Sequence, residues 1–456
     1  MVPPEPAAPP SLAEQLIDIQ WSLDGSQWQS SADLERLQFA RLTTLASHAY
    51  NAIPEYRQRL RATGYRPGRP MTMAIWQNIP VLRRADLQRL GNTLRVRRLS
   101  SAQFGDQYEA SSSGSTGVPV RVWKSGLDWQ MWQAICVREE LWHGDGCAGT
   151  YAAIKGFAGS DFTAEQQAAL RSPTGLILPD WGPPMNLVRN TGTSALIHGS
   201  VSMQDKAAFL IRVEPRYLLT APSGLRLLAQ YFRDHDLKLP SLKSVRTVSE
   251  RLDEDVRELC RAVFGCEIIH NYSANEVGYM AVQCPLHQHF HVQSEVVYLE
   301  IIDEHGAPCP PGQIGRVVVT PLHNFAMPLL RYEIGDEAEF GEPCSCGRGL
   351  PVIRNVIGRT ADYLTLPDGS RRRVTYNVYR MSTLRAVREY QVVQTALDAI
   401  EVRVVAMRAL QAAEIAEISD IMTREFGGDF RVAITEVDEL PRTAAGKLRP
   451  FVSELT

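Results

Sequence analysis

The chain has 456 residues, of which 44% are hydrophobic and 22% charged, and its formal net charge is −3. This composition is that of a globular protein with material for two or three domains. Because no long basic run is present, the charge pattern gives no reason to expect nucleic-acid binding. No apolar run reaches the roughly 18 residues of a membrane span. The Pro-rich start lacks a signal peptide's pattern, so we expect a cytoplasmic protein whose residues 1–10 form a disordered tail.

The first half of the chain alternates between helical and extended patterns. Residues 11–65 carry apolar side chains three and four positions apart, which predicts helices, and residues 79–90 predict a turn and another helix. A strand pattern at 118–124 follows a run of serine and glycine, as in a hairpin with a glycine loop. The same periods then predict helices at 127–143 and 224–235, and strands at 150–157 and 217–223. This alternation predicts an α/β core.

From about Glu295 the sequence becomes rich in short strands. Closely spaced strand patterns predict a β-rich subdomain at about 280–359, within a large domain spanning residues 11–359. Beyond Arg359, short strand and helix patterns predict a separate, small α+β domain at 360–456. The eight cysteines are expected to be thiols or metal ligands rather than disulfides, because no secretory signal is present.

The serine run SSSGSTG at 111–117 has two readings. Its glycines let backbone amides approach a ligand, and its hydroxyls can donate to phosphate oxygens, which is typical of a phosphate-binding loop. It matches neither the Walker A loop nor the dinucleotide-binding glycine motif, and a surface linker would look similar. Taken alone, the run leaves both readings open.

Three further motifs follow in order. NYSANEVG at 271–278 contains Tyr272 four positions before Glu276, LLRYEIGDEAEF at 329–340 places Asp336 in a Gly-Asp turn between strands, and LPRTAAGKLRP at 440–450 sets Lys447 after a glycine. Each has a plain structural explanation by itself. Together, in this order, the four stretches resemble the motifs of the adenylate-forming superfamily of acyl-CoA synthetases and adenylation domains. NFAMPLLRYEIGD and CSCGRGLPVI make the chain similar to the phenylacetate-CoA ligase branch, from about residue 80 to the C-terminus.

The resemblance implies a reaction and its cofactors. Such enzymes use ATP and Mg²⁺ to convert a carboxylic acid to an acyl-adenylate with release of pyrophosphate, and then transfer the acyl group to a phosphopantetheine thiol. The protein contributes positioning and charge stabilisation. Coenzyme A is the expected acceptor, and a phosphopantetheinylated carrier protein is the alternative that the motifs leave open. The branch also implies an aryl acid, and it leaves the oligomeric state open between a monomer and a homodimer.

The resemblance also assigns roles residue by residue. Glu276 matches the magnesium-binding glutamate, Lys447 matches the lysine that bridges the carboxylate and the α-phosphate, and Asp362 matches the hinge about which a mobile C-terminal domain rotates. The expected nucleotide-binding residues are Ser112, Ser113, Gly114, Ser115, Thr116 and Gly117 at the phosphates, Tyr272 near the adenine, Asn275 near the α-phosphate, Asp336 on the ribose hydroxyls and Arg359 at the domain junction.

The sequence departs from the family pattern at three positions. Val120 follows Pro119 where the family loop usually has a lysine, so one phosphate-binding cation is absent. Ser273 replaces a glycine, and Asn275 replaces the hydroxyl residue that would contact the α-phosphate. An amide can still donate a hydrogen bond, so adenylation stays plausible.

A second candidate site is suggested by CPLHQHFH at 284–291 and CSC at 344–346, which bring three cysteines and three histidines into one region. Zinc takes four thiolate or imidazole ligands tetrahedrally, and a closed site of four is structural. Some relatives in this branch carry such a zinc. By that resemblance the expected ligands are Cys284, His291, Cys344 and Cys346, with His287 and His289 as rivals; buried thiols without a metal are the alternative.

The middle of the chain offers candidates for the acid pocket, each of which could equally lie in the core: Trp142, Tyr151, Phe157, Trp181 and His270. A function of another class is also consistent with the motifs, namely a zinc-stabilised, nucleotide-binding protein without ligase activity. The altered Tyr272–Glu276 motif favours that reading, whereas the intact PRTAAGK stretch argues against it.

Overall fold

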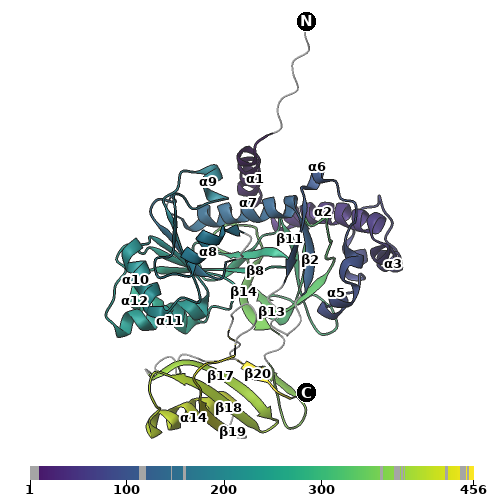
Figure 1. Ribbon diagram of the computed structural model, residues 1–456. Coiled ribbons are helices and arrows are strands. Elements are labelled where there is room, and N and C mark those ends of the chain that lie inside the picture. Colours follow the sequence, from purple (N-terminus) through teal and green to yellow (C-terminus); the bar gives the residue numbers. More distant parts are fainter. Residues whose placement is uncertain are drawn as a thin grey trace.

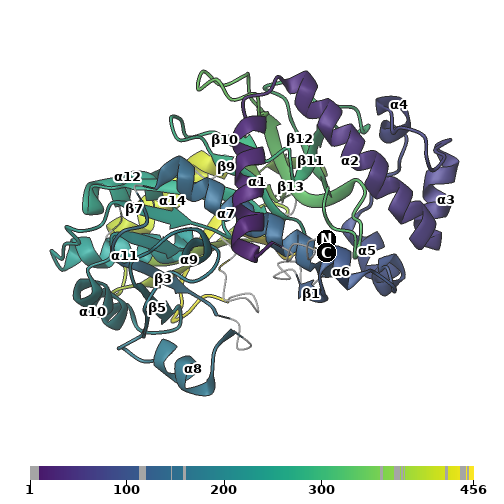
Figure 2. The same cartoon turned by 90° about the horizontal axis from the view of Figure 1, so that it is seen from above.

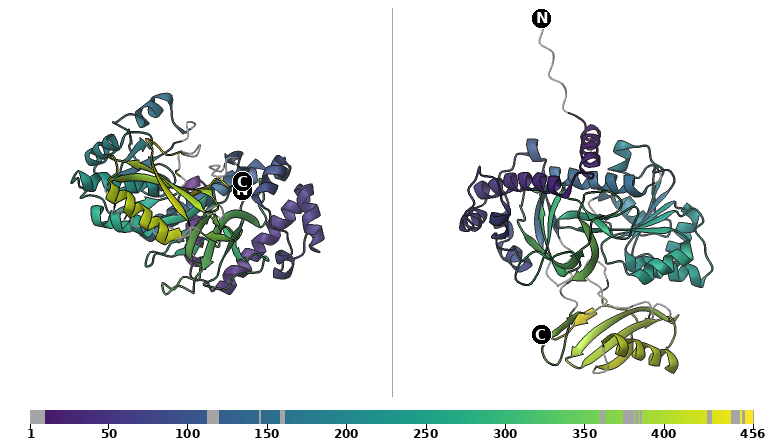
Figure 3. Two further views of the ribbon diagram at one scale, coloured as in Figure 1. Left: turned by 90° about the horizontal axis from the view of Figure 1, so that it is seen from below. Right: turned by 180° about the vertical axis from the view of Figure 1, so that it is seen from behind.

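The computed structural model describes residues 10–111, 120–144, 146–157, 161–359, 363–373, 381, 384, 386–426, 430–441, 448 and 451–455. These residues form a large α/β unit and a smaller C-terminal unit that lies against one side of it, below the large unit in Figure 1 and in the right panel of Figure 3. Among the described helices, none combines the length and the apolar character that crossing a bilayer requires.

One twelve-stranded sheet runs through the described part of the large unit, in the order β11-β12-β13-β14-β10-β9-β8-β7-β6-β3-β5-β4. The run from β5 to β8 is parallel, and from β8 to β11 the neighbours are antiparallel, as is the edge strand β4 against β5. The strands are β3 (Tyr151–Lys155), β4 (Leu176–Leu178), β5 (Ser194–His198), β6 (Tyr217–Thr220), β7 (Ser244–Thr247), β8 (Glu267–Ala274), β9 (Gly278–Gln283), β10 (Phe290–Val292), β11 (Val297–Ile302), β12 (Ile314–Pro321), β13 (Tyr332–Phe340) and β14 (Val352–Arg359).

Helices cover both faces of the parallel half. Ala152 and Ile154 of β3 pack into one core, and Ala153 between them packs into another, because successive side chains of a strand point to opposite faces. Strands buried on both faces read as nearly continuous apolar runs. The covering helices are α10 (Met203–Val213), α11 (Pro222–Asp234) and α12 (Glu254–Phe264) on the first face, and α8 (Ala164–Leu170) on the second.

The antiparallel half packs against the N-terminal helices. Figure 2 shows α2 running across the strands near β11 and β12, and apolar side chains of α2 and of these strands share one core. Ser11 and Glu14 form a reciprocal capping box that starts α1. The remaining helices of this unit are α1 (Leu12–Ser26), α2 (Ser31–Ala52), α3 (Pro54–Ala62), α4 (Met73–Gln77), α5 (Arg84–Leu90), the 3₁₀ turn Gly91–Leu94, α6 (Ser101–Phe104), α7 (Gly126–His143) and α9 (Met185–Val188).

The predicted hairpin around the serine run is confirmed on both of its flanks. Strand β1 (Gln107–Ser111) pairs antiparallel with β2 (Arg121–Ser125). Ser111, the first residue of the serine run, lies opposite Arg121. Helix α7 begins directly after β2, at the end of the hairpin where Gln107 pairs with Ser125.

The smaller unit has its own apolar core between a four-stranded sheet and one helix. The sheet order is β19-β18-β17-β20, and β15 and β16 form a separate pair. The predicted class, an α/β unit followed by a small α+β unit, is confirmed, whereas the boundary at 359/360 stays a prediction. The elements are β15 (Tyr363–Thr365), β16 (Arg371–Arg373), β17 (Val387–Ala396), β18 (Ala399–Ala406), α14 (Ala412–Phe426), β19 (Arg431–Glu436) and β20 (Phe451–Ser453).

A buried ion pair ties α7 to the sheet. The Arg138 guanidinium lies 2.9 and 3.1 Å from the two carboxylate oxygens of Glu295, and both side chains are at most 3% exposed. Arg138 also donates to Gln293 at 2.8 Å and to the carbonyl oxygen of Leu23 in α1. None of the eight cysteines, all of which are described, forms a disulfide, as expected.

Replacing Arg138 by methionine should lower the free energy of unfolding by about 3–5 kcal/mol, because Glu295 would stay buried without its countercharge. Burial alone would raise the pKa of Glu295, but Arg138 outweighs burial and lowers it. A lowered carboxyl pKa stabilises the fold above the ordinary value of about 4.3, and this contribution is lost as the pH falls through the lowered pKa. Urea unfolding of the wild-type protein and the Arg138→Met variant at pH 7 and pH 3.5 measures the difference in their free energies of unfolding. An equal difference at both pH values would contradict the prediction.

Candidate active site

A cleft of about 2160 Å³ opens at the carboxyl ends of the parallel strands β3, β6, β7 and β8. Residues of the smaller unit, among them Tyr390 and Leu448, also line it. Open α/β sheets bind ligands at this edge, because the loops that follow the strands gather there. Since pockets for one small ligand measure roughly 300–1,000 Å³, the cleft has room for a nucleotide together with a second substrate.

Two motif residues that are 64 positions apart meet in this cleft. The Tyr272 hydroxyl at the end of β8 donates to Asp336 Oδ2 at 2.8 Å, and both residues line the cleft. The prediction of a turn at Asp336 is wrong, because this residue lies inside β13 and pairs with Arg359 of β14. On the β12 side the register slips between Arg316 and Val318, so residues 334–336 bulge out around Gly335, whose φ of +88° suits glycine. Such a bulge re-aims a side chain without ending the strand.

Two other residues of the 271–278 motif lie at Ser111 and in the cleft wall. Asn275 donates from Nδ2 to the carbonyl oxygen of Ser111 at 3.0 Å, which fastens the end of β1 to the end of β8. Glu276 is buried in the cleft wall, with its Oε1 3.5 Å from a guanidinium nitrogen of Arg84. Asn275 therefore supports the loop from its flank, and Glu276 presents a carboxylate to the cleft.

Several predicted residues lie outside the described part of the chain. These are Ser112, Ser113, Gly114, Ser115, Thr116, Gly117, Asp362 and Lys447. Arg359 closes β14, and its side chain is likewise not among those described. Leu448, directly after Lys447, lines the cleft. Val120, which stands where the family loop has a lysine, is 1% exposed and belongs to the core of the antiparallel half.

Four of the five candidates for the acid pocket line the cleft: Tyr151, Phe157, Trp181 and His270. Burial lowers the pKa of His270 to about 4, so its ring is neutral and donates from Nδ1 to the carbonyl oxygen of Thr247 at 3.0 Å. Trp142 is different. Its ring lies against the His291 ring and the Arg348 guanidinium, and it is absent from the cleft lining among the described residues.

The sequence reasoning missed one wall of the cleft. Trp129, Trp132, Cys136 and Glu139 of α7 all line it, together with Tyr279 of β9. Their positions i, i+3, i+7 and i+10 share one helix face, and this spacing is the signal that could have found them. Burial raises the pKa of Tyr279 well above its usual value, so its hydroxyl stays protonated and can donate.

Comparison with known proteins agrees with this geometry. Residues 373–454 match the family described as the CapK C-terminal domain. A phenylacetate-coenzyme A ligase of Thermus thermophilus is 26% identical over 351 residues, which cover 73% of this chain and 72% of that enzyme. A 2-hydroxyisobutyryl-CoA ligase solved with 2-HIB-AMP in its postadenylation state has a TM-score of 0.72 at 16% identity, covering 93% of this chain and 90% of that one.

The chain is similar in sequence to phenylacetate-coenzyme A ligases and has the fold of a CoA ligase that forms an acyl-adenylate. The resemblance inferred from the motifs is thus confirmed. The same 2-hydroxyisobutyryl-CoA ligase in its thioesterification state has a TM-score of 0.57 at 18% identity, covering 94% of this chain and 91% of that one. The structure of this chain is thus more similar to the postadenylation structure than to the thioesterification structure.

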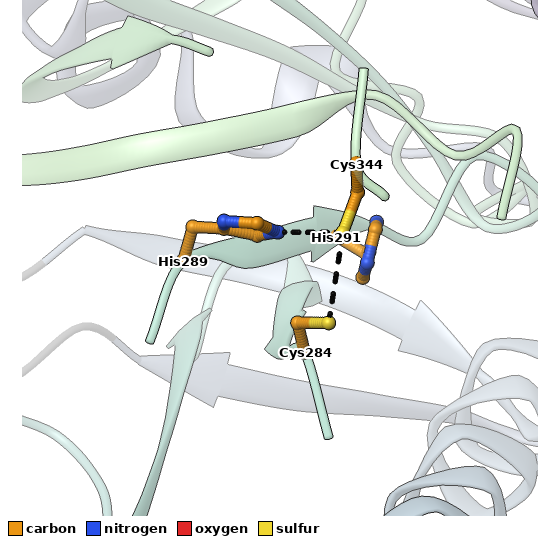
Figure 4. A group of neighbouring side chains, drawn as sticks. All are labelled: Cys284, His289, His291 and Cys344. Atoms are coloured by element: carbon orange, nitrogen blue, oxygen red, sulfur yellow. Dashed lines mark hydrogen bonds between the residues drawn. The ribbon is translucent and has the colours of Figure 1, made fainter. Parts of the chain in front are cut away.

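The cysteine and histidine motifs gather into one cluster. Ligand atoms of Cys284, His289, His291 and Cys344 lie within 4.8 Å of one another, and Figure 4 shows these side chains converging from separate segments. The Cys284 and Cys344 sulfurs are 3.8 Å apart, and His289 Nε2 is 3.1 Å from Cys344 Sγ. The predicted set contained Cys346 in place of His289, one of the two rivals.

The two remaining residues lie at the edge of the same cluster. Cys346 Sγ is 3.3 Å from His291 Nε2, and His287 Nδ1 is 3.5 and 3.4 Å from the sulfurs of Cys284 and Cys344. Burial lowers the pKa of His291 to about 4, and its Nδ1 lies 3.3 Å from the Leu350 carbonyl oxygen. A neutral ring held in this way turns its Nε2 lone pair toward the thiols, as a metal ligand would.

Proposed function

We propose that this protein is an AMP-forming acid–thiol ligase that activates a carboxylic acid with ATP and transfers the acyl group to coenzyme A. The observation that carries the proposal is the meeting of Tyr272, Asp336 and Glu276 in one cleft at the carboxyl ends of the parallel strands. A carboxylate oxygen of the acid attacks the α-phosphorus of ATP, and the bond to pyrophosphate breaks. The thiol of coenzyme A then attacks the acyl carbon and AMP leaves.

The residues of the cleft suit these steps. Asp336, aimed outward by the bulge in β13, would accept hydrogen bonds from the ribose hydroxyls, and Tyr272 holds its carboxylate by one oxygen. Glu276 would hold Mg²⁺, a hard cation that in such sites takes few protein carboxylates together with phosphate oxygens and water. When bound, the ion neutralises charge on the phosphates. Lys447 would stabilise the negative charge that develops at the α-phosphate.

The lining of the cleft supports an aromatic acid. Trp129 and Trp132 stack with ring centroids 4.6 Å apart, and Trp132 is 6.1 Å from the Tyr279 ring. Tyr151 and Trp181, 5.1 Å apart, also line the cleft. Planar rings bind between such side chains through apolar contact and offset stacking.

ATP-dependent pyrophosphate release tests the proposal across benzoic, phenylacetic, aminobenzoic and aliphatic acids, without any thiol. Release with an aryl acid, followed by thioester formation when coenzyme A is added, is the expected result. Thioester formation with a phosphopantetheinylated carrier protein and not with coenzyme A would show that the carrier protein is the acceptor. ATP binding without turnover of any acid would instead favour the non-catalytic reading.

Replacing Asp336 by alanine should raise the KM for ATP by about 10–100-fold, because hydrogen bonds to a charged acceptor contribute about 1.5–3 kcal/mol. Tyr272→Phe removes only the bond that orients Asp336, so we expect a rise of roughly 2–10-fold. Initial rates of pyrophosphate release at varied ATP measure both effects. An unchanged KM for ATP in the Asp336→Ala variant would contradict the proposal that Asp336 binds the ribose.

We also propose that the cysteine and histidine cluster holds a structural zinc ion. Two thiolates on a tetrahedral zinc, each about 2.3 Å from the metal, lie roughly 3.8 Å apart. The Cys284 and Cys344 sulfurs have this separation. The donor set of soft thiolates and imidazoles also suits zinc. His287 is a further candidate ligand, because its Nδ1 faces both sulfurs while its Nε2 lies 3.2 Å from the Ser345 hydroxyl.

A further inference from the structure

One face of α7 presents its side chains to the cleft in a fixed order. Starting at the N-terminal end of the helix, these are the indoles of Trp129 and Trp132, the thiol of Cys136 and the carboxylate of Glu139. The first three offer aromatic or weakly polar surface to a substrate ring. Glu139 follows one turn beyond Cys136, so the aromatic wall ends at a carboxylate.

The carboxylate of Glu139 is held in place by neutral donors. The Tyr279 hydroxyl donates to Oε2 at 2.9 Å, and Asn271 donates from Nδ2 to Oε1 at 3.3 Å. Glu139 is only 3% exposed, yet it is part of the cleft lining. Each carboxylate oxygen can accept a second hydrogen bond, so the group keeps acceptor capacity for a ligand.

The charges around Glu139 do not balance. Arg246 forms an ion pair with the neighbouring Glu140, so one guanidinium serves two buried carboxylates. Lys155, a further cation that lines the cleft, interacts electrostatically with Asp161. Burial lowers the pKa of His143, so this ring on the same helix adds no charge. Because buried charges are normally paired, a guanidinium shared between two buried carboxylates leaves Glu139 able to accept a further donor.

We propose that the acid activated by this protein carries an amino group, which donates hydrogen bonds to Glu139 at the end of the aromatic wall. This inference rests on the proposed ligase function and names the class of its substrate, an amino-substituted aryl acid. The ring lies along Trp129, Trp132 and Tyr279, and the amino group donates to the remaining acceptor positions of the Glu139 carboxylate.

The chemistry of the site distinguishes an amino group from groups of similar size. A methyl group has nearly the same volume but cannot donate, so it would leave the Glu139 carboxylate buried without a partner. A site built to hydrogen-bond a substrate group discriminates strongly against the analogue that lacks it, because its own polar group is left unpaired. A hydroxyl can donate one hydrogen bond, whereas an amino group can donate two, one to each oxygen.

Matched acids test the inference in the wild-type protein. The ortho, meta and para isomers of aminobenzoic, hydroxybenzoic and methylbenzoic acid, and the corresponding phenylacetic acids, are compared by kcat/KM for pyrophosphate release. At least one amino isomer should exceed the methyl isomer of the same position by about tenfold or more. Calorimetric titration of the same acids in the presence of AMP gives a second readout that does not depend on turnover.

Two variants locate the preference at Glu139. In Glu139→Gln the ratio of amino to methyl kcat/KM should fall by about tenfold, since the amide keeps the shape but loses the charge. Glu304→Gln is the matched control, because it removes a carboxylate that is exposed in a turn and should leave the ratio unchanged. Tyr279→Phe frees one oxygen of Glu139 and should also shift the ratio, which provides a second probe if Glu139→Gln does not fold.

The outcomes separate the inference from the ligase function. Pyrophosphate release with methyl or hydroxy isomers at least as fast as with amino isomers would overturn the inference and leave the ligase function intact. Tight binding of an amino isomer that Glu139→Gln weakens, without turnover of any acid, would support the site and overturn the ligase function. If no amino-substituted acid in the series binds or is turned over, both the inference and the ligase function are overturned.

Discussion

Replacing Lys447 by alanine should lower the rate of acyl-adenylate formation by about 10²–10³-fold. The loss of one donor that stabilises developing charge has an effect of this size in comparable sites. ATP binding should change little, because the phosphates and the ribose have other partners in the proposed site. Lys447 follows a glycine near the C-terminus, and its neighbour Leu448 lines the cleft, which is where a lysine acting at the α-phosphate must lie.

Pyrophosphate release without a thiol measures the adenylation step, and calorimetric titration with ATP measures binding. Lys238→Ala is a suitable control, because Lys238 is exposed and pairs with Asp236 in a turn of the large unit. A second test starts from chemically prepared acyl-adenylate. The Lys447 variant should still transfer this acyl group to coenzyme A, and a loss of transfer equal to the loss of adenylation would indicate damage to both steps. Full adenylation activity in the Lys447→Ala variant would contradict the proposed role of Lys447 in adenylate formation.

Removal of zinc should lower the thermal stability of the protein. The proposed ligands join the turn between β9 and β10 to the segment before β14, so the metal would link two parts of the antiparallel half. Loss of about 3 kcal/mol would lower the melting temperature by roughly 5–10 °C, since each kcal/mol corresponds to a few degrees in a domain of this size. Cys344→Ala should have the same effect as a chelator, because Cys344 lies against Cys284 and His289.

Elemental analysis of the purified protein should find one zinc per chain, and the Cys344 variant should contain none. Cys260→Ala is the control for loss of a buried thiol, because Cys260 is fully buried in the core of the parallel half, away from the cluster. The variants His289→Ala, His287→Ala and Cys346→Ala then identify the remaining ligands by their zinc content. The proposed metal site would be contradicted if the protein contains no zinc and melts at the same temperature with and without chelator.

Local sequence patterns predicted the fold class, and the motifs in their order predicted the resemblance to the superfamily. The hairpin around the serine run and the helical pattern of 127–143 could be predicted, because hydrophobic periods and glycine-rich loops are local properties of the chain. The residues of one motif could likewise be recognised together, as with Tyr272 and Glu276. Local patterns of this kind require no knowledge of which strand pairs with which.

The way in which distant segments meet could not be predicted from such local patterns. The β-rich segment predicted as a subdomain continues the sheet of the α/β core, because β8 pairs with β7 on one side and with β9 on the other. Asp336 reaches the cleft from a bulged strand, since the slip against β12 depends on a partner that the local sequence does not specify. His289 entered the cysteine cluster for a related reason, because the register of β10 sets which histidines face Cys344.

The wall formed by α7 follows the same principle. Its helical period was visible in the sequence, but whether Glu139 faces solvent, core or cleft depends on the elements that surround the helix. Sequence periodicity determines which side chains share a face, and long-range pairing determines what that face meets.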